Sequence, residues 1–243
     1  MEFQSPLVRG TLVKRYKRFL ADVTLDSGEA VTASCPNTGS MKGLTDPGCP
    51  VWLSLSDNPK RKYKHTFEMI EVDIGQGPVI VGINTGHPNK LVEEGILNGK
   101  IKELKGYKSL KREQKYGKNS RIDILLRKTE DEDSDRCYVE VKNVHLMRSS
   151  GVAEFPDSVT SRGAKHLVEL SDMVREGHRA VMVYLIQRND TKKFAFAGDI
   201  DPEYVATFQA ARKAGVEALA YACDVTPGGI AVIRKVKIVD PQG

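Results

Sequence analysis

The sequence has few cysteines, and none of them are spaced for metal binding. Its 243 residues include four, Cys35, Cys49, Cys137 and Cys223, with no CxxC motif and no Cys/His pairing. Zinc sites and disulfide frameworks require such spacings. We therefore expect neither, and we expect reduced thiols in a cytosol.

Long apolar runs are also missing. The segment 180–186 is one of the longest, whereas a membrane-spanning helix needs about 20 residues. The first ten residues lack the basic region and apolar stretch of a secretory signal, and no internal repeat or low-complexity segment is present. These absences predict a cytoplasmic globular protein that does not contact a membrane.

Basic residues exceed acidic residues only modestly, with a net charge of +5, but they are concentrated. The segment 100–121 holds nine basic residues and two acidic ones, Glu103 and Glu113. Two earlier clusters, 14–18 and 60–64, combine basic residues with tyrosine, a pattern suited to phosphates and stacked bases. Solvated loops are the alternative for any single cluster. Together, the clusters predict binding to DNA, single-stranded or duplex.

The first part of the chain, residues 1–84, alternates apolar and polar residues in short segments separated by turn-rich sequence. This pattern predicts a small β-barrel, for which a five-stranded oligonucleotide-binding (OB) barrel is one candidate. The expected strands are Leu7–Val13, Phe19–Leu25, Ala30–Ser34, Val51–Ser56, Phe67–Val72 and Val79–Ile83.

The second part, residues 85–243, mixes helical and strand periodicities and predicts an α/β domain. The continuous apolar run Ala180–Ile186 is typical of a strand buried on both faces. The expected helices are Leu91–Leu97, Thr160–Arg175 and Pro202–Ala214, and the other expected strands are Arg121–Leu126, Tyr138–Val144, Val216–Cys223 and Ile230–Val239.

Two of these strands carry a polar constellation that can perform chemistry. The period of two places Glu140 and Lys142 on one face of their strand, and Asp123 opposite the apolar residues of its own. A hairpin centred symmetrically on the acidic connection Glu130–Asp135 would set Asp123 across from Lys142 and beside Glu140. Two carboxylates suit Mg²⁺ or Mn²⁺, which can polarise a phosphodiester, while the lysine neutralises developing charge. A solvated sheet face with a weak ion pair is the alternative.

The neighbouring helices offer further candidates. Glu94 lies three residues from both Leu91 and Leu97, so we expect it on their inward face as a third metal-binding acid, with Glu93 facing solvent. Arg162 and His166 are four residues apart on another helix and face the same way, so they can contact phosphate; a surface position is the alternative for His166. The full set expected to bind nucleic acid is Lys14, Arg15, Lys17, Arg18, Lys60, Arg61, Lys62, Lys115, Arg121, Arg162 and His166.

These residues also carry a family resemblance. The chain resembles the sugar fermentation stimulation protein A family over essentially its whole length. The motifs that carry the resemblance are Arg15–Val23, Cys35–Met41, Ser56–Lys62, Asn119–Asp123, Tyr138–Val144, Phe155–Asp157 and Arg162–His166.

The resemblance implies an OB barrel followed by a PD-(D/E)xK nuclease-like α/β domain, DNA binding, and a bacterial or archaeal cytoplasm. It maps the acids of that fold onto Asp123 and Glu140, its lysine onto Lys142 and its helical acid onto Glu94. Two functions remain open: a Mg²⁺-dependent nuclease, or a non-catalytic DNA-binding regulator linked to maltose metabolism with a vestigial site. An interaction module without nucleic acid is the third alternative.

Overall fold

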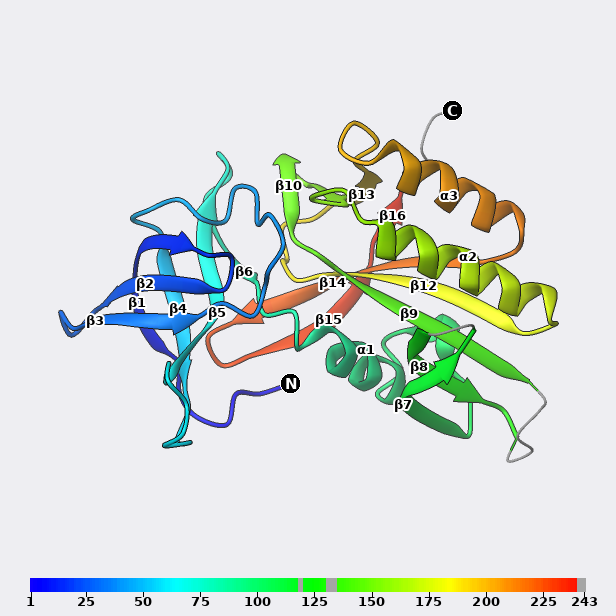
Figure 1. The fold of residues 1–243 in the computed structure, drawn as a ribbon, viewed down its shortest axis with the longest axis horizontal. Helices are drawn as coiled ribbons and strands as arrows, with labels where there is room; N and C mark the ends of the chain where they lie inside the picture. Colours follow the sequence, from blue (N-terminus) through cyan, green and yellow to red (C-terminus); the bar gives the residue numbers. More distant parts are fainter. Residues whose placement is uncertain (118–119, 130–134, 240–243) are drawn as a thin grey trace.

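The N-terminal part of the chain folds into a β-barrel in the computed structural model, which describes residues 1–117, 120–129 and 135–239 (Figure 1). Its strands are β1 (Val8–Tyr16), β2 (Leu20–Leu25), β3 (Ala30–Ser34), β4 (Pro50–Leu55), β5 (His65–Asp73) and β6 (Pro78–Gly82). Each overlaps a strand that the sequence periodicity predicts.

The barrel is closed by a parallel pairing between β3 and β5, while β1 joins β2 to β4 and β6 extends from β5. Alternate residues of each strand, including Leu12, Val23, Leu53 and Phe67, point inward and are buried. Burial of one face of each strand follows from the pleat, so the alternating pattern predicts this core. The closed five-strand arrangement confirms the OB-like barrel.

The second domain is built on a six-stranded sheet in the order β15-β14-β12-β9-β8-β7. The central strands β9, β12 and β14 are mutually parallel, and antiparallel strands form both edges. The strands are β7 (Ser109–Tyr116), β8 (Ser120–Arg127), β9 (Arg136–Val144), β12 (Arg179–Ile186), β14 (Glu217–Thr226) and β15 (Gly229–Lys235). A central strand covered on both faces explains the continuous apolar run of β12.

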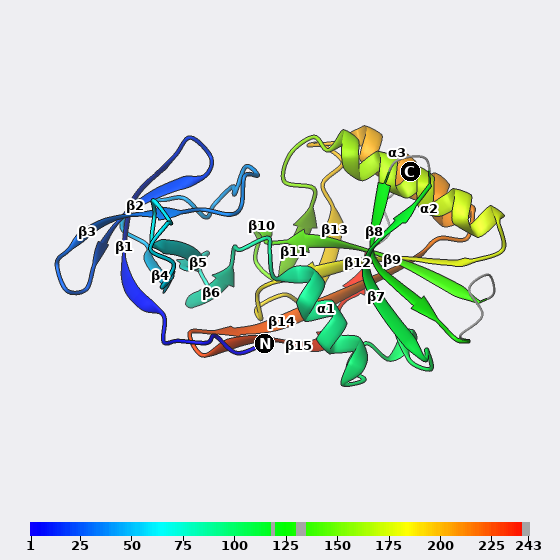
Figure 2. The same cartoon turned by 60° about the horizontal axis from the view of Figure 1, so that its bottom comes forward.

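Helices cover both faces of this sheet (Figure 2). The helices α2 (Ser161–Arg175) and α3 (Pro202–Lys213) pack on one face over a core that includes Leu167, Tyr184 and Phe208. The helix α1 (Pro88–Leu97) packs on the other face, followed by the short helix η1 (Lys102–Leu104). Among the described residues, no helix is both long and apolar enough to cross a lipid bilayer. The four cysteines are free thiols.

Several strands lack a recognisable signal in the sequence. The strand β7 lies in the basic segment and exposes most of its charged side chains, so it lacks the apolar alternation that predicts a strand. A second, four-stranded sheet is made of short segments: β10 (Leu146–Ser149), β11 (Val152–Phe155), β13 (Lys193–Phe196) and β16 (Lys237–Ile238). Strands of two to four residues carry too little periodicity to be recognised.

The register of β8 against β9 differs from the symmetric hairpin. Ile124 pairs with Val139 and Leu125 with Tyr138, so the register set by these pairs brings Asp123 level with Glu140 rather than Lys142. The expected pairing was wrong by two residues because the connection is not centred where its acidic run suggests. An even slip by itself would keep every side chain on its face. The strand β8 does not keep a strict period of two at this point, however, because Ile122 packs with the core under α2, whereas Ile124 packs with the core under α1. Residues 130–134 of the acidic connection lie outside the described residues. Lys118 of the basic segment also lies outside them.

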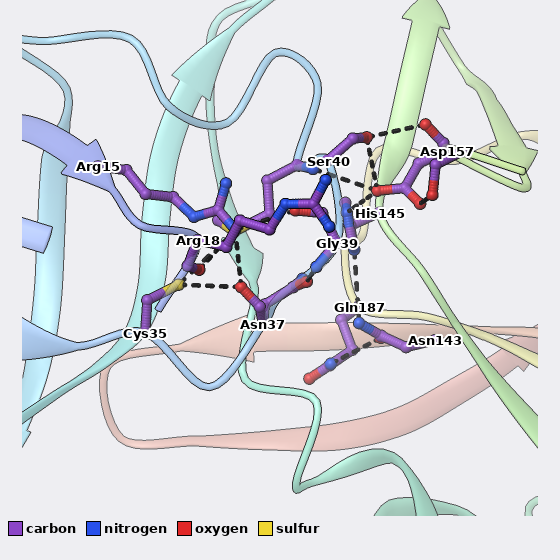
Figure 3. Close-up of polar contacts among 12 residues, drawn as sticks. Arg15, Arg18, Cys35, Asn37, Gly39, Ser40, Asn143, His145, Asp157 and Gln187 are labelled. Atoms are coloured by element: carbon purple, nitrogen blue, oxygen red, sulfur yellow. Dashed lines mark hydrogen bonds and ion pairs between the residues drawn. The ribbon is translucent and has the colours of Figure 1, made fainter. Parts of the chain in front are cut away.

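The two domains meet in a polar junction on the loop after β3 (Figure 3). Ser40 Oγ donates to Asp157 Oδ2 over 2.9 Å, and His145 Nε2 lies 3.4 Å from the same oxygen. A Cβ at Gly39 would come within 3.0 Å of Asn37 and 3.3 Å of Asp157, so a larger residue would push the loop away. A second contact is made by the start of the chain, because Met1 and Glu2 pair with β15. These first residues thus pack on the α/β domain, although we expected them in the barrel domain.

We predict that Asp157→Asn weakens this junction in a pH-dependent way. Burial alone would raise the pKa of Asp157, but its contacts with His145, Ser40 and the Met41 N–H outweigh burial and hold the pKa well below its usual range. A depressed carboxyl pKa adds stability above the unfolded-state pKa, and that stability is lost as the pH falls towards the folded-state pKa. Urea denaturation at about pH 7 should show a loss of about 1–3 kcal/mol.

The difference between Asp157→Asn and the wild type should shrink below about pH 4, where the unfolded carboxyl becomes protonated. Asp26→Asn is the control, because Asp26 forms an exposed ion pair with Arg9. A difference that stays constant from neutral to acidic pH would contradict this account of the junction.

Candidate active site

The sheet brings Asp123 and Glu140 together at the edge of the face that carries α2. Asp123 Oδ2 accepts a hydrogen bond of 2.7 Å from the backbone N–H of Val141, the residue after Glu140. Asp123 Oδ1 accepts one of 2.9 Å from the Asn89 side chain on α1. Glu140 comes from the central strand β9, and its side chain is only 2% exposed. Two carboxylates from adjacent strands therefore stand in a largely water-excluded site.

Glu140 is held by two side chains. Lys142 Nζ donates to Glu140 Oε1 over 2.8 Å, and His166 Nδ1 forms a short contact with the same oxygen. Lys142 Nζ also lies 3.2 Å from His166 Nδ1, and Arg162 Nε lies 3.4 Å from His166 Nε2. The second oxygen, Glu140 Oε2, is buried and has no hydrogen-bond partner within the described residues.

The electrostatics of the two carboxylates differ. Burial, followed by the negative charge of Glu140, raises the pKa of Asp123 despite its hydrogen bonds. Burial would also raise the pKa of Glu140, but the His166 hydrogen bond and the Lys142 charge outweigh it, so the pKa is lowered. Glu140 is thus kept ionised beside a carboxyl that repels it. Such a pair favours an added cation.

A cleft of about 490 Å³ opens at Asp123 and is lined by charged side chains of both signs. Arg121, Arg162 and Lys165 supply the positive charge, and Glu113 is the other acid. Glu113 has a positive φ of 54° at a point where the pairing of β7 with β8 is interrupted between Arg112 and Gln114, although the register is the same on both sides. A positive φ is uncommon for a residue other than glycine, and such backbone strain is often found at functional sites.

The structure does not bring Glu94 to this cleft. Its carboxylate pairs with the Met1 amino group at 2.7 Å and with Lys90 at 3.9 Å. The inward face was misassigned because Leu97 is 71% exposed, and α1 buries Leu91, Val92, Gly95 and Ile96 instead. The residue of α1 that does contact Asp123 is Asn89, which also lies 3.3 Å from Glu113. The sequence did not point to Asn89, because only acidic residues of this helix were considered as metal ligands.

The barrel residues expected to bind nucleic acid fall into two groups. Arg15 and Arg61 are half-buried and stabilise loops: Arg15 donates to three backbone carbonyls, and Arg61 to Ser34 and Thr66. The others are exposed: Lys14, Lys17, Arg18, Lys60 and Lys62. Lys115 is exposed on β7, and Arg121 and Arg162 are exposed in the cleft. His166, in contrast, is buried against Glu140.

The residues present fit a divalent cation. Asp123 and the unpartnered Glu140 Oε2 provide two hard oxygen ligands, and Mg²⁺ commonly takes one or two carboxylates and completes its shell with water and phosphate oxygens. No cluster of three or more acidic, histidine or cysteine ligands is found among the described residues, so an ion here would rely on such additional oxygens.

Fold and site together define a two-domain protein in which an OB barrel precedes an α/β domain with a buried pair of carboxylates. Residues 13–83 match the model of the SfsA N-terminal OB domain, and residues 86–229 match that of the sugar fermentation stimulation protein RE domain. The chain therefore belongs to the sugar fermentation stimulation protein family.

Relatives extend over the full chain. A sugar fermentation stimulation protein homolog of Brucella anthropi is 60% identical over 230 residues, covering 95% of this chain and 96% of the relative. A homolog of Brucella ovis is 56% identical over 240 residues, covering 99% and 98%. Among solved structures, Pyrococcus furiosus SfsA in complex with Ca²⁺ matches with a TM-score of 0.85 at 28% identity, covering 98% of both chains.

We predict that His166→Ala destabilises the protein without added metal. The substitution removes one of the two partners of a buried carboxylate, which should cost about 1–3 kcal/mol in urea denaturation near neutral pH. Val168→Ala on the same helix is the control, since Val168 is 51% exposed and should change stability by less than about 0.5 kcal/mol. If His166→Ala were as stable as the wild type, Lys142 alone would be sufficient to neutralise Glu140.

Proposed function

We propose that this protein is a divalent-metal-dependent nuclease that hydrolyses phosphodiester bonds in DNA. One observation carries the proposal: Asp123 and His166 line a cationic cleft, and Glu140, which contacts His166, keeps Oε2 buried without a partner among the described residues. A buried, unpartnered carboxylate oxygen is costly unless a ligand satisfies it. The Ca²⁺ complex of the Pyrococcus furiosus relative supports a divalent cation as that ligand.

Asp123 and Glu140 would hold Mg²⁺ or Mn²⁺. Such a cation supplies Lewis-acid polarisation of a phosphodiester and lowers the pKa of water in the cleft. Lys142 keeps its ammonium 2.8 Å from Glu140, where it can orient an attacking water or neutralise charge developing on the phosphate. His166 keeps Glu140 in place and is a positioning residue.

The rim of the cleft fits the substrate. Arg121, Arg162 and Lys165 place three positive charges around Asp123, as needed to bind the phosphates on either side of a scissile bond. Glu113 replaces Glu94 as the further acid near the metal, because Asn89 links its carboxylate to that of Asp123. The OB barrel then contributes a second, non-specific contact with the DNA strand.

We predict that Asp123→Ala and Glu140→Ala each abolish metal-dependent cleavage, because one carboxylate cannot hold and orient the cation alone. Lys142→Ala should retain Mn²⁺ binding in calorimetry but lose most of the rate, since its ammonium acts in the transition state. Cleavage is measured on labelled single-stranded, duplex and branched DNA with Mg²⁺ or Mn²⁺. Glu94→Ala is the matched control and should cleave like the wild type, because Glu94 pairs with Met1 and Lys90.

The outcomes separate the two functions left open by the sequence. No cleavage of any DNA form by the wild type, together with no Mn²⁺ binding, would leave a non-catalytic DNA-binding regulator. Loss of activity in Glu94→Ala comparable to that in Asp123→Ala would instead return Glu94 to the catalytic site.

A further prediction concerns the barrel surface. Replacing both Lys60 and Lys62 by alanine should reduce the slope of log affinity against log salt by roughly 0.9 for each phosphate that is no longer neutralised on duplex DNA, or roughly 0.7 on single strands. Both lysines are exposed, whereas Arg61 between them supports the fold. The control replaces Lys192 and Lys193, two exposed lysines of the α/β domain. An unchanged slope in the first variant would remove the 60–62 loop from the DNA-binding surface.

A further inference from the structure

A second cavity of about 800 Å³ lies beside the catalytic cleft, on the other side of Lys165. Its walls come from the end of β7, from β9 and from successive turns of α2, and they include Tyr116, Tyr138, Glu169 and Met173. Lys165 lines both cavities, and its ammonium lies 3.2 Å from Ser120 Oγ at the rim of the cleft. A chain bound in the cleft can therefore place its next unit in this cavity.

Glu169 in this cavity has a carboxylate that the protein does not satisfy. Its side chain is only 8% exposed, and neither oxygen has a hydrogen-bond partner within the described residues. The Lys165 ammonium lies 3.5 Å from Oε1 and forms an ion pair, not a hydrogen bond. A carboxylate accepts hydrogen bonds only, so a ligand that completes this site must present donors, and two neighbouring donors would satisfy both oxygens.

Tyr116 is the other incomplete group. Its hydroxyl is buried and, among the described residues, has no hydrogen-bond partner. Burial and then the negative charges of Glu140, Glu169 and Asp123 raise its pKa. Tyr116 lines the cavity together with Glu169. The ring of Tyr116 packs on that of Tyr138 at 5.6 Å, so the wall beside Glu169 is aromatic.

The mouth of the cavity is suited to an anionic chain. Lys115 and Lys165 are exposed there, while Arg175 is already paired with Asp172 and Arg136 donates to the Tyr138 hydroxyl. Positive charge at the rim, an aromatic wall and a buried acceptor inside form a combination that recognises a nucleotide whose base has been turned out of a stack.

We propose that this cavity binds a guanine base of the DNA strand held in the catalytic cleft. Guanine presents N1–H and the N2 amino group side by side, and these two donors match the two oxygens of Glu169. Adenine and cytosine present one amino group next to a ring acceptor, and thymine presents one N–H between two carbonyls, so each would set a lone pair against the carboxylate. The proposal rests on the proposed nuclease function, because it assigns the substrate preference of that site.

The test compares three single-stranded oligonucleotides of eleven nucleotides, all thymidine except for a central guanine, hypoxanthine or adenine. Binding to the wild-type protein is measured by fluorescence anisotropy with EDTA present, so that no cleavage occurs. Hypoxanthine keeps N1–H and lacks the amino group, so it leaves one Glu169 oxygen unsatisfied. We expect guanine to bind about tenfold more tightly than either alternative.

Glu169→Gln should erase this preference, because the amide replaces one acceptor oxygen by an NH2 donor, which would oppose one of the two donors of the guanine edge. Glu203→Gln on α3 is the matched control: Glu203 is exposed, and its substitution should leave the preference unchanged. Circular dichroism checks that each variant is folded. If Glu169→Gln does not fold, the affinities of the wild-type protein for the guanine and hypoxanthine oligonucleotides still test the proposal.

The results distinguish this inference from the nuclease proposal. Equal affinity for guanine and hypoxanthine, with metal-dependent cleavage intact, would overturn the guanine site and leave the nuclease standing. Guanine preference that depends on Glu169, without cleavage in Mg²⁺ or Mn²⁺, would support the base site and overturn the nuclease. No binding of any oligonucleotide would overturn both. If the protein is a nuclease and the cavity binds guanine, the cleaved bond should lie within one or two nucleotides of the guanine.

Discussion

The buried carboxylate of Glu140 is the constraint on which the α/β domain depends. A charge in the middle of a sheet is costly unless it is neutralised, and breaking such a pair leaves an uncompensated buried charge. Lys142 supplies an ion pair from the same strand, and His166 supplies a second contact from α2. Because both contacts are made to Oε1, Oε2 has no partner among the described residues.

The position of α2 then links the barrel, the cleft and the second cavity. Asp157, which joins the two domains through Ser40, lies four residues before the first residue of the helix. The N-cap Thr160 accepts from Gly163 N–H, and its own N–H donates to Asp201, so the chain enters the helix in a defined direction. Successive turns carry Arg162 to the cleft, His166 to Glu140 and Glu169 to the cavity. One helix therefore lines both the cleft and the second cavity.

Sequence patterns predicted most of the architecture wherever one residue class alternated with another. The barrel strands and the buried run of β12 follow directly from their apolar positions. The strand β7 was missed because its outward residues are charged and its inward residues are mostly half-buried. It is held by pairing with β8, a partner that no local pattern reveals. Helix boundaries at α2 and α3 were predicted to within a residue or two, since capping residues are local signals.

By itself, the sequence determined that Glu140 and Lys142 share one face of β9, because the pleat has a period of two. How Asp123 joins them was decided by the tertiary structure, since Ile122 and Ile124 beside it pack in the cores on opposite faces of the sheet. Tertiary structure decided which groups surround them. Asn89 reaches Asp123 and Glu113 through the docking of α1, whereas Glu94 pairs with the amino group of Met1. His166 became a buried partner of Glu140 rather than a surface contact. The residues that contact Asp123 and Glu140 come from segments distant in sequence, so these contacts form only when the helices pack against the sheet.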